Sequence, residues 1–136
     1  MKAHLTRRYV FSASHRLHSN AMSDTENAAT YGKCNNPYGH GHNYALEVTV
    51  SGQVAEATGM VCNLVDLDGF VHSEILERFD RENLNLRPEF DRIVPTTENL
   101  CTTIYDILQR GFTQAHLERI RIEETMMNSF EYEGDN

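Results

Sequence analysis

The chain has 136 residues, and its 12 Lys and Arg against 20 Asp and Glu give a formal net charge of −8. With 40% hydrophobic and 24% charged residues, we expect one folded domain spanning residues 1–136 rather than a disordered chain. The acidic balance argues against nucleic-acid binding, which normally requires an excess of Lys and Arg. No apolar run approaches the roughly 20 residues of a membrane helix, so no membrane partner is expected.

The cysteines and the N-terminus predict a cytoplasmic location. Cys34, Cys62 and Cys101 are odd in number and far apart, which is a poor disulfide framework. The residues before Arg7 include no apolar stretch of the kind that a secretion signal needs. Because the chain has seven histidines and no tryptophan, the histidines are the first candidates for chemistry.

The N-terminal half predicts two strands separated by a long loop. Residues with β propensity favour a strand over Leu5–Ala13 and a second strand over His42–Ser51. Residues 16–41 are predicted to form a polar loop, and such a loop in a small domain is typically functional. One face of the second strand is apolar, with Tyr44, Leu46, Val48 and Val50.

Two helices are expected next. Asp66 is a candidate N-cap for a helix that runs to about Phe79. Thr96 or Thr97 is the candidate cap of a second helix, and Gly111 marks its end.

The alternation over Leu117–Glu124 predicts a further strand, and Phe130–Glu133 is a short candidate partner. The expected order is therefore β-β-α-α-β-β. It describes an α+β domain with a four-stranded antiparallel sheet and two helices on one face. Open sheet edges and a modest core favour self-association.

Three histidines are predicted to converge on the inner face of the sheet. His40 and His42 are two residues apart and share the parity of the apolar face of their strand. His15 has the same parity as the inner residues of the first strand. Three neutral imidazoles with one open position are the usual ligands of a catalytic Zn²⁺. The alternative is that these are hydrogen-bonded core or turn histidines.

Cys34 lies six residues before His40, and three interpretations are open for it. It is a fourth zinc ligand, an inert buried thiol, or a base. A thiolate beside Lys33 and a metal would have a lowered pKa, which favours the base.

Of four further charged residues, Glu124 and Glu98 have both a structural and a functional interpretation. Glu124 faces inward at a strand end, where it pairs with an arginine or binds a ligand edge that offers two N–H groups. Glu98 is a capping-box carboxylate or a ligand contact. Asp80 and Arg81 follow the first predicted helix and, on spacing alone, form a solvated charge pair.

These motifs together resemble the 6-pyruvoyl-tetrahydropterin synthase family. The resemblance spans nearly the whole chain, and the C-x5-H-x-H spacing is similar to its pyruvoyl branch rather than to the related 6-carboxy-tetrahydropterin synthases. The matching segments occur in family order and are FSASHRL (11–17), GKCNNPYGHGHNY (32–44), GMVCNLVDL (59–67), PTTEN (95–99) and EET (123–125).

The resemblance implies the tunnelling fold (T-fold), in which trimeric barrels stack into a homo-hexamer with active sites between subunits. It implies Zn²⁺ bound by His15, His40 and His42. The implied general base is Cys34.

The implied pterin anchor is Glu124, supported by the segment Thr96, Thr97 and Glu98. The implied reaction is a lyase reaction that converts 7,8-dihydroneopterin triphosphate to 6-pyruvoyl-tetrahydropterin with loss of triphosphate. Arg7, Arg16 and Lys33 are candidates for binding the triphosphate.

The sequence departs from the family at one position. Family members typically read D-H-x-N-L after the first long helix, where Asp and His complete a proton relay with the cysteine. Here Asp80 is kept and Arg81 replaces the histidine. Arginine stays protonated at any working pH and cannot relay protons as imidazole does. Two alternatives are therefore open: an enzyme that makes another 6-substituted pterin, or a non-catalytic module that binds zinc and pterin.

Overall fold

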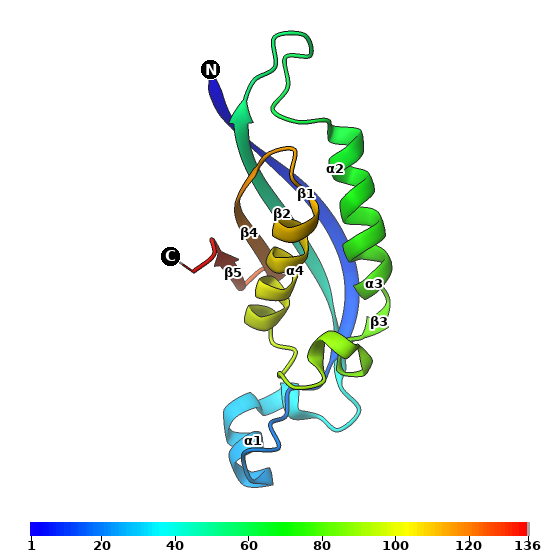
Figure 1. Ribbon diagram of the computed structural model, residues 1–136. Helices are drawn as coiled ribbons and strands as arrows, with labels where there is room; N and C mark the ends of the chain where they lie inside the picture. Colours follow the sequence, from blue (N-terminus) through cyan, green and yellow to red (C-terminus); the bar gives the residue numbers. More distant parts are fainter. Residues whose placement is uncertain (136) are drawn as a thin grey trace.

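A five-stranded sheet with helices packed over one face forms the computed structural model, which describes residues 1–135 (Figure 1). The strand order is β3-β1-β2-β4-β5, and every neighbouring pair is antiparallel except β1 with β3. The strands are β1 (Lys2–His15), β2 (His40–Gln53), β3 (Glu82–Asn83), β4 (His116–Thr125) and β5 (Asn128–Tyr132).

The predicted α+β class is confirmed, and so are the four antiparallel strands. The prediction that the sheet has only four strands, all antiparallel, is wrong. Glu82 and Asn83 add a two-residue parallel strand beside Ala13 and Ser14. The backbone of Ser12 holds this segment in place, because its N–H donates to the Asp80 carboxylate and its carbonyl accepts the N–H of Arg81.

β1 and β2 are longer than expected, and their register places the histidines. The ladder continues without a break to the pair His15–His40, with Ala13 opposite His42 and Phe11 opposite Tyr44. Because side chains alternate across a strand, all of these residues point to the helix-covered face.

The segment predicted as a loop contains a helix, α1 (Asp24–Tyr31), followed by a 3₁₀ turn over Gly32–Asn35. Ser23 and Glu26 form a capping box, in which each side chain accepts the backbone N–H of the other. Asn27 is fully buried, and its amide bonds to the backbone of Ser19 and of the turn before α1.

The two predicted helices are present, and only the first has a shifted start. The first comprises α2 (Leu64–Val71), a π-helical turn over His72–Leu76 and α3 (Glu77–Phe79). Its N-cap is Asn63 rather than Asp66, because the Asn63 amide oxygen accepts the N–H groups of Val65 and Asp66. No helix within residues 1–135 combines the length and the hydrophobicity needed to cross a bilayer.

The second predicted helix is α4 (Thr97–Gly111), and its cap is Thr96, whose hydroxyl accepts the N–H of Asn99. Figure 1 shows α4 beside the α2–α3 run on the same side of the sheet. The two contact each other where the Phe70 ring packs against the backbone of Gly111.

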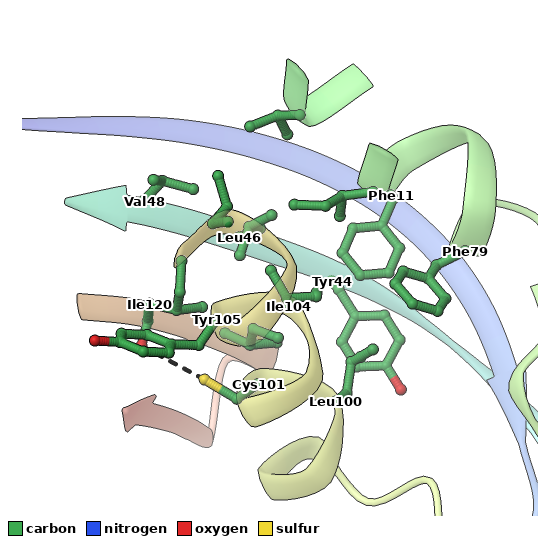
Figure 2. Packing of buried hydrophobic residues seen from close by; sticks show 14 of the residues in the cluster. Phe11, Tyr44, Leu46, Val48, Phe79, Leu100, Cys101, Ile104, Tyr105 and Ile120 are labelled. Carbon is green, nitrogen blue, oxygen red and sulfur yellow. Dashed lines mark hydrogen bonds between the residues drawn. The ribbon is translucent and has the colours of Figure 1, made fainter. Parts of the chain in front are cut away.

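The core lies between this helical layer and the sheet. Figure 2 shows Leu46, Val48 and Ile120 of the sheet facing Ile104 of α4. Toward the histidine end, the rings of Phe11 and Tyr44 are stacked with centroids 5.1 Å apart. The hydrophobic core therefore extends directly into the region that carries the histidines.

An ionic contact fixes α2 against β1. The Arg7 guanidinium donates to both carboxylate oxygens of Asp68, at 3.0 and 2.8 Å, and the Tyr9 hydroxyl donates to the same carboxylate at 2.7 Å. These bonds favour the ionised carboxylate, so the pKa of Asp68 is lowered, first by Arg7 and then by Tyr9.

We predict that Asp68→Asn destabilises the protein at pH 7 and that the difference from wild type shrinks in acid. A carboxylate with a lowered folded-state pKa stabilises the fold above its unfolded pKa of about 3.9, and this contribution is lost as the pH falls through the folded value. Urea unfolding at pH 7 and below pH 3 measures the difference. Asp106→Asn, an exposed carboxylate of α4, is the control, and an equal loss in that variant would contradict the assignment.

Candidate functional site

Three imidazole rings meet at one end of the helix-covered face. The centroids are 4.9 Å apart for His15 and His40, 5.0 Å for His15 and His42, and 4.5 Å for His40 and His42. All three pairs meet edge to face. The predicted convergence of the histidines is confirmed, and its cause is the β1–β2 register.

Each ring presents a buried nitrogen that has no hydrogen bond to the described part of the chain, residues 1–135. These nitrogens are Nε2 of His15, Nδ1 of His40 and Nε2 of His42. For His15 the tautomer follows from its other nitrogen. Nδ1 lies 2.8 Å from the Pro95 carbonyl, which can only accept, so Nδ1 carries the proton and Nε2 keeps its lone pair.

Burial favours the neutral form of two of these imidazoles, His15 and His42. It lowers the pKa of His15, and it also lowers the pKa of His42 although the Glu124 carboxylate opposes the shift. Neutral imidazoles with free lone pairs are what a metal ion requires. The donor set therefore fits zinc better than it fits a hydrogen-bonded core, because core imidazoles would have partners for these nitrogens.

The ligand atoms form two overlapping groups that share His15. His15, Cys34 and His40 make one group, and His15, His42 and Glu124 make the other, with the donor atoms of each group within 4.8 Å of one another. The site is thus larger than three histidines, since a thiol and a carboxylate lie beside them.

Glu124 faces inward, as predicted, but it has no arginine partner within residues 1–135. Its Oε1 lies 3.1 Å from Nε2 of His42 and 3.7 Å from Nε2 of His15, and Oε2 accepts from the Asn128 amide. The angle to His42 does not make a hydrogen bond, so that nitrogen remains without a partner. The interpretation of Glu124 as half of an arginine ion pair is wrong.

Cys34 is partly exposed at the 3₁₀ turn, so it is not an inert buried thiol. Two hydrogen bonds to Leu17 fix the position of Cys34. The Cys34 carbonyl accepts the N–H of Leu17, and the amide of the neighbouring Asn35 donates to the Leu17 carbonyl. Without metal, burial and then the Glu124 charge raise the pKa of Cys34. The lowered pKa that is expected beside Lys33 and a metal stays a prediction for the metal-bound protein.

Tyr44 belongs to the site, although the sequence analysis counted it only as a core residue. Its hydroxyl is buried without a hydrogen bond, and its ring meets that of His42 at 5.7 Å. Burial, with smaller effects of Glu124 and Cys34, raises the pKa of Tyr44. The signal was present in the sequence, because Tyr44 is the next residue after His40 and His42 on the same face.

The segment Thr96 to Glu98 forms the first turn of α4 beside Pro95. Thr97 is buried and Glu98 is exposed. The capping-box interpretation of Glu98 is wrong, because Thr96 is the cap and Asn99 occupies the third helical position.

Asp80 and Arg81 lie at the outer edge of β1. No hydrogen bond or ion pair within residues 1–135 connects either of them to Cys34, and the expected ion pair between the two side chains does not form. The Asp80 carboxylate accepts the N–H of Ser12, and Arg81 has a positive φ of 61°.

The three basic candidates for phosphate binding differ in availability. Arg7 is bound by Asp68 and lies eight residues along β1 from His15, about 26 Å at the usual rise of a strand. Arg16 directly follows His15, and its Nε donates to the Asn35 carbonyl. Lys33 is exposed beside Cys34. Within one chain, only Arg16 and Lys33 lie near the histidines.

We predict that Cys34 in chelator-treated protein is alkylated with an apparent pKa above that of an ordinary thiol. Glu124→Gln should shift the profile to lower pH, because a neutral amide no longer opposes the thiolate. Rates of iodoacetamide labelling against pH, with peptide mapping, measure this. Glu123→Gln, whose carboxylate pairs with Arg8 instead, is the matched control. An unchanged profile in Glu124→Gln would contradict the contact.

Comparisons with known proteins point to one family. The profile of the family "6-pyruvoyl tetrahydropterin synthase" matches residues 4–135. The chain is 45% identical over 135 residues to the human 6-pyruvoyl tetrahydrobiopterin synthase, covering 98% of this chain and 93% of that protein. It is 47% identical over 133 residues to the Poecilia reticulata enzyme of the same name, covering 97% and 90%.

A solved structure shows the same fold over almost the full length. The Caenorhabditis elegans 6-pyruvoyl tetrahydropterin synthase superposes with a TM-score of 0.93 at 39% identity, covering 99% of this chain and 97% of that one. Family profile, sequence relatives and fold all agree. This chain therefore belongs to the 6-pyruvoyl tetrahydropterin synthase family.

Proposed function

We propose that the protein is a zinc-dependent lyase that converts 7,8-dihydroneopterin triphosphate to 6-pyruvoyl-tetrahydropterin with loss of triphosphate. The observation that carries the proposal is the set of three buried imidazole nitrogens without hydrogen bonds, beside a thiol and a carboxylate. Such a set is costly unless it serves a ligand, because buried polar atoms without partners lose their hydration.

His15, His40 and His42 would hold the Zn²⁺ ion. When bound, zinc acts as a Lewis acid that polarises the side-chain oxygens of the substrate and acidifies the neighbouring carbon-bound proton. The Pro95 carbonyl orients His15 for this role by fixing the proton on Nδ1.

Cys34 is the proposed general base, because its sulfur lies beside His15 and His40 and is partly open to solvent. The Glu124 carboxylate would accept two N–H groups of the pterin ring, with help from the Thr96–Glu98 turn. Its nearness to His42 in the ligand-free chain supports a position at the edge of the metal site.

The proposed assembly is a homo-hexamer of two trimers, in the cytoplasm. Two open sheet edges support association. Within residues 1–135, β1 has a partner on its outer edge only at Ala13 and Ser14, and β5 has none. Long unpaired edges are normally covered by another strand.

The arginine at position 81 supports a second candidate function. Because it replaces the relay histidine and lies away from Cys34 in the chain, the same site would give a different 6-substituted pterin if proton transfer ends elsewhere. A non-catalytic module that binds zinc and pterin is the third possibility. Identification of the products by mass separates these three functions.

Elemental analysis should find zinc in the wild-type protein, close to one ion per chain. His15→Ala should bind far less, because it removes a ligand and the link to Pro95. His116→Ala, an exposed histidine of β4, is the matched control and should keep its zinc. Wild-type protein that neither contains zinc nor takes it up on addition would contradict the site.

Zinc-loaded protein mixed with 7,8-dihydroneopterin triphosphate should release triphosphate and form the pyruvoyl product. Cys34→Ala should keep its zinc and lose roughly 10²- to 10⁴-fold in turnover, the usual contribution of a general base. Cys62→Ala, which removes a thiol outside the site, controls for the loss of a cysteine. Intact substrate despite bound zinc and measurable binding would instead favour the non-catalytic module.

A further inference from the structure

A pocket opens on the face of the sheet that the helices leave uncovered. It has a volume of about 500 Å³, and its wall comes from β1, β2 and the segment around β3, with no helical residue. We call it the Arg81 pocket; it is lined by Ser12, Ala13, Ser14, Gly41, His42, Asn43, Arg81, Glu82 and Asn83.

The polar groups of the Arg81 pocket are mainly hydrogen-bond donors. The Arg81 guanidinium has no ion pair or hydrogen bond within residues 1–135. The Ser12 hydroxyl donates to the amide oxygen of Asn43 at 2.6 Å, which leaves the Asn43 NH₂ group free to donate into the pocket. The Ser14 hydroxyl makes no hydrogen bond to residues 1–135 and is a further donor. Guanidinium, amide and hydroxyl donors in one pocket are suited to a phosphate chain.

The backbone holds Arg81 in a conformation that the residue itself does not favour. Its φ of 61° is the only positive value among non-glycine residues of the described chain. Two bonds impose it, from the Arg81 N–H to the Ser12 carbonyl and from the Ser12 N–H to the Asp80 carboxylate. Strain of this kind persists where the surroundings enforce it, and it is frequent at functional sites.

Glu82 is the one acidic residue in the pocket wall. It makes no ion pair within residues 1–135, so it weakens the positive field of Arg81 without neutralising it through a contact. A phosphate chain in the pocket would be attracted by Arg81 and repelled by Glu82. Loss of the Arg81 charge should therefore weaken phosphate binding, and loss of the Glu82 charge should strengthen it.

The pocket and the histidine cluster lie on opposite faces of the same strands. Ser12, Ser14 and Asn43 alternate with Ala13 and His42, whose side chains point to the helix-covered face. A substrate cannot pass through the sheet. If one substrate contacts both places, the histidines and the Arg81 pocket must come from different copies of the chain.

We propose that the Arg81 pocket binds the triphosphate group of a substrate whose pterin is held by a neighbouring subunit. The identity of the substrate in this proposal rests on the proposed function, whereas the binding of anions by the pocket does not. Arg81 then acts in substrate binding, in the position where the family pattern has a relay histidine.

Inorganic tripolyphosphate, titrated calorimetrically into zinc-loaded protein, tests the pocket without any turnover. Arg81→Gln and Asn43→Asp should weaken binding by tenfold or more, and Glu82→Gln should tighten it. Arg110→Gln removes the same charge from the exposed end of α4 and should change binding less than twofold. Wild-type protein that does not bind tripolyphosphate, or equal binding by Arg81→Gln, would overturn the proposal.

Arg81→Gly separates binding from folding. Because glycine accepts a positive φ, this variant should unfold at the wild-type temperature or above and still lose tripolyphosphate binding. Retained binding in Arg81→Gly would overturn the role of the side chain.

Mixed assemblies test the placement between subunits. Arg81→Gln and Cys34→Ala chains, each impaired alone at low substrate concentration, should regain activity when co-expressed, because some interfaces then contain both intact residues. No recovery in verified mixed oligomers would overturn the placement. If wild-type protein binds tripolyphosphate through Arg81 but forms no pyruvoyl product, the proposed function fails while the pocket stands.

Discussion

The antiparallel register of β1 and β2 is the constraint on which the rest of the site depends. It pairs His15 directly with His40, and Ala13 with His42, so that three imidazoles reach one face from two adjacent strands. A shift of one residue in either strand would turn its histidines to the uncovered face, because side chains alternate with a period of two. The long β1–β2 ladder and the core beneath it therefore position the histidines of the site as well as stabilising the fold.

Burial of the polar groups around the three histidines costs free energy of folding. Burial lowers the pKa of His15 and His42 and raises that of Cys34 and Tyr44, so all four groups favour their neutral forms. Four buried polar atoms of the cluster have no hydrogen-bond partner within residues 1–135: one ring nitrogen of each histidine and the Tyr44 hydroxyl. A cation at this point would satisfy the nitrogens and compensate the nearby Glu124 charge, which gives the arrangement a physical reason.

The two faces of the sheet end have different characters. The helix-covered face presents imidazole nitrogens whose lone pairs can bind a metal ion. The uncovered face presents N–H and O–H hydrogen-bond donors around Arg81. Alternate residues of the same segments of β1 and β2 serve the two faces, so the distance between the two sets of groups is fixed by the thickness of one sheet. A second copy of the chain is needed to bring both sets of groups to one substrate, which relates the proposed assembly to the proposed chemistry.

Local sequence patterns determined the four antiparallel strands, the two long helical runs and the inward direction of His15, His40, His42 and Glu124, because alternation and helical spacing depend only on chain geometry. The capping box before α1 was also readable from Ser23 and Glu26, although the loop prediction passed over it. Tertiary contacts decided the rest. The parallel strand β3 exists because Ser12 binds the backbone after α3, and Pro95 reaches His15 from 80 residues away. Within the described residues 1–135, the lack of an arginine partner at Glu124 and the placing of Arg81 on the uncovered face depend on long-range packing, which no local pattern encodes.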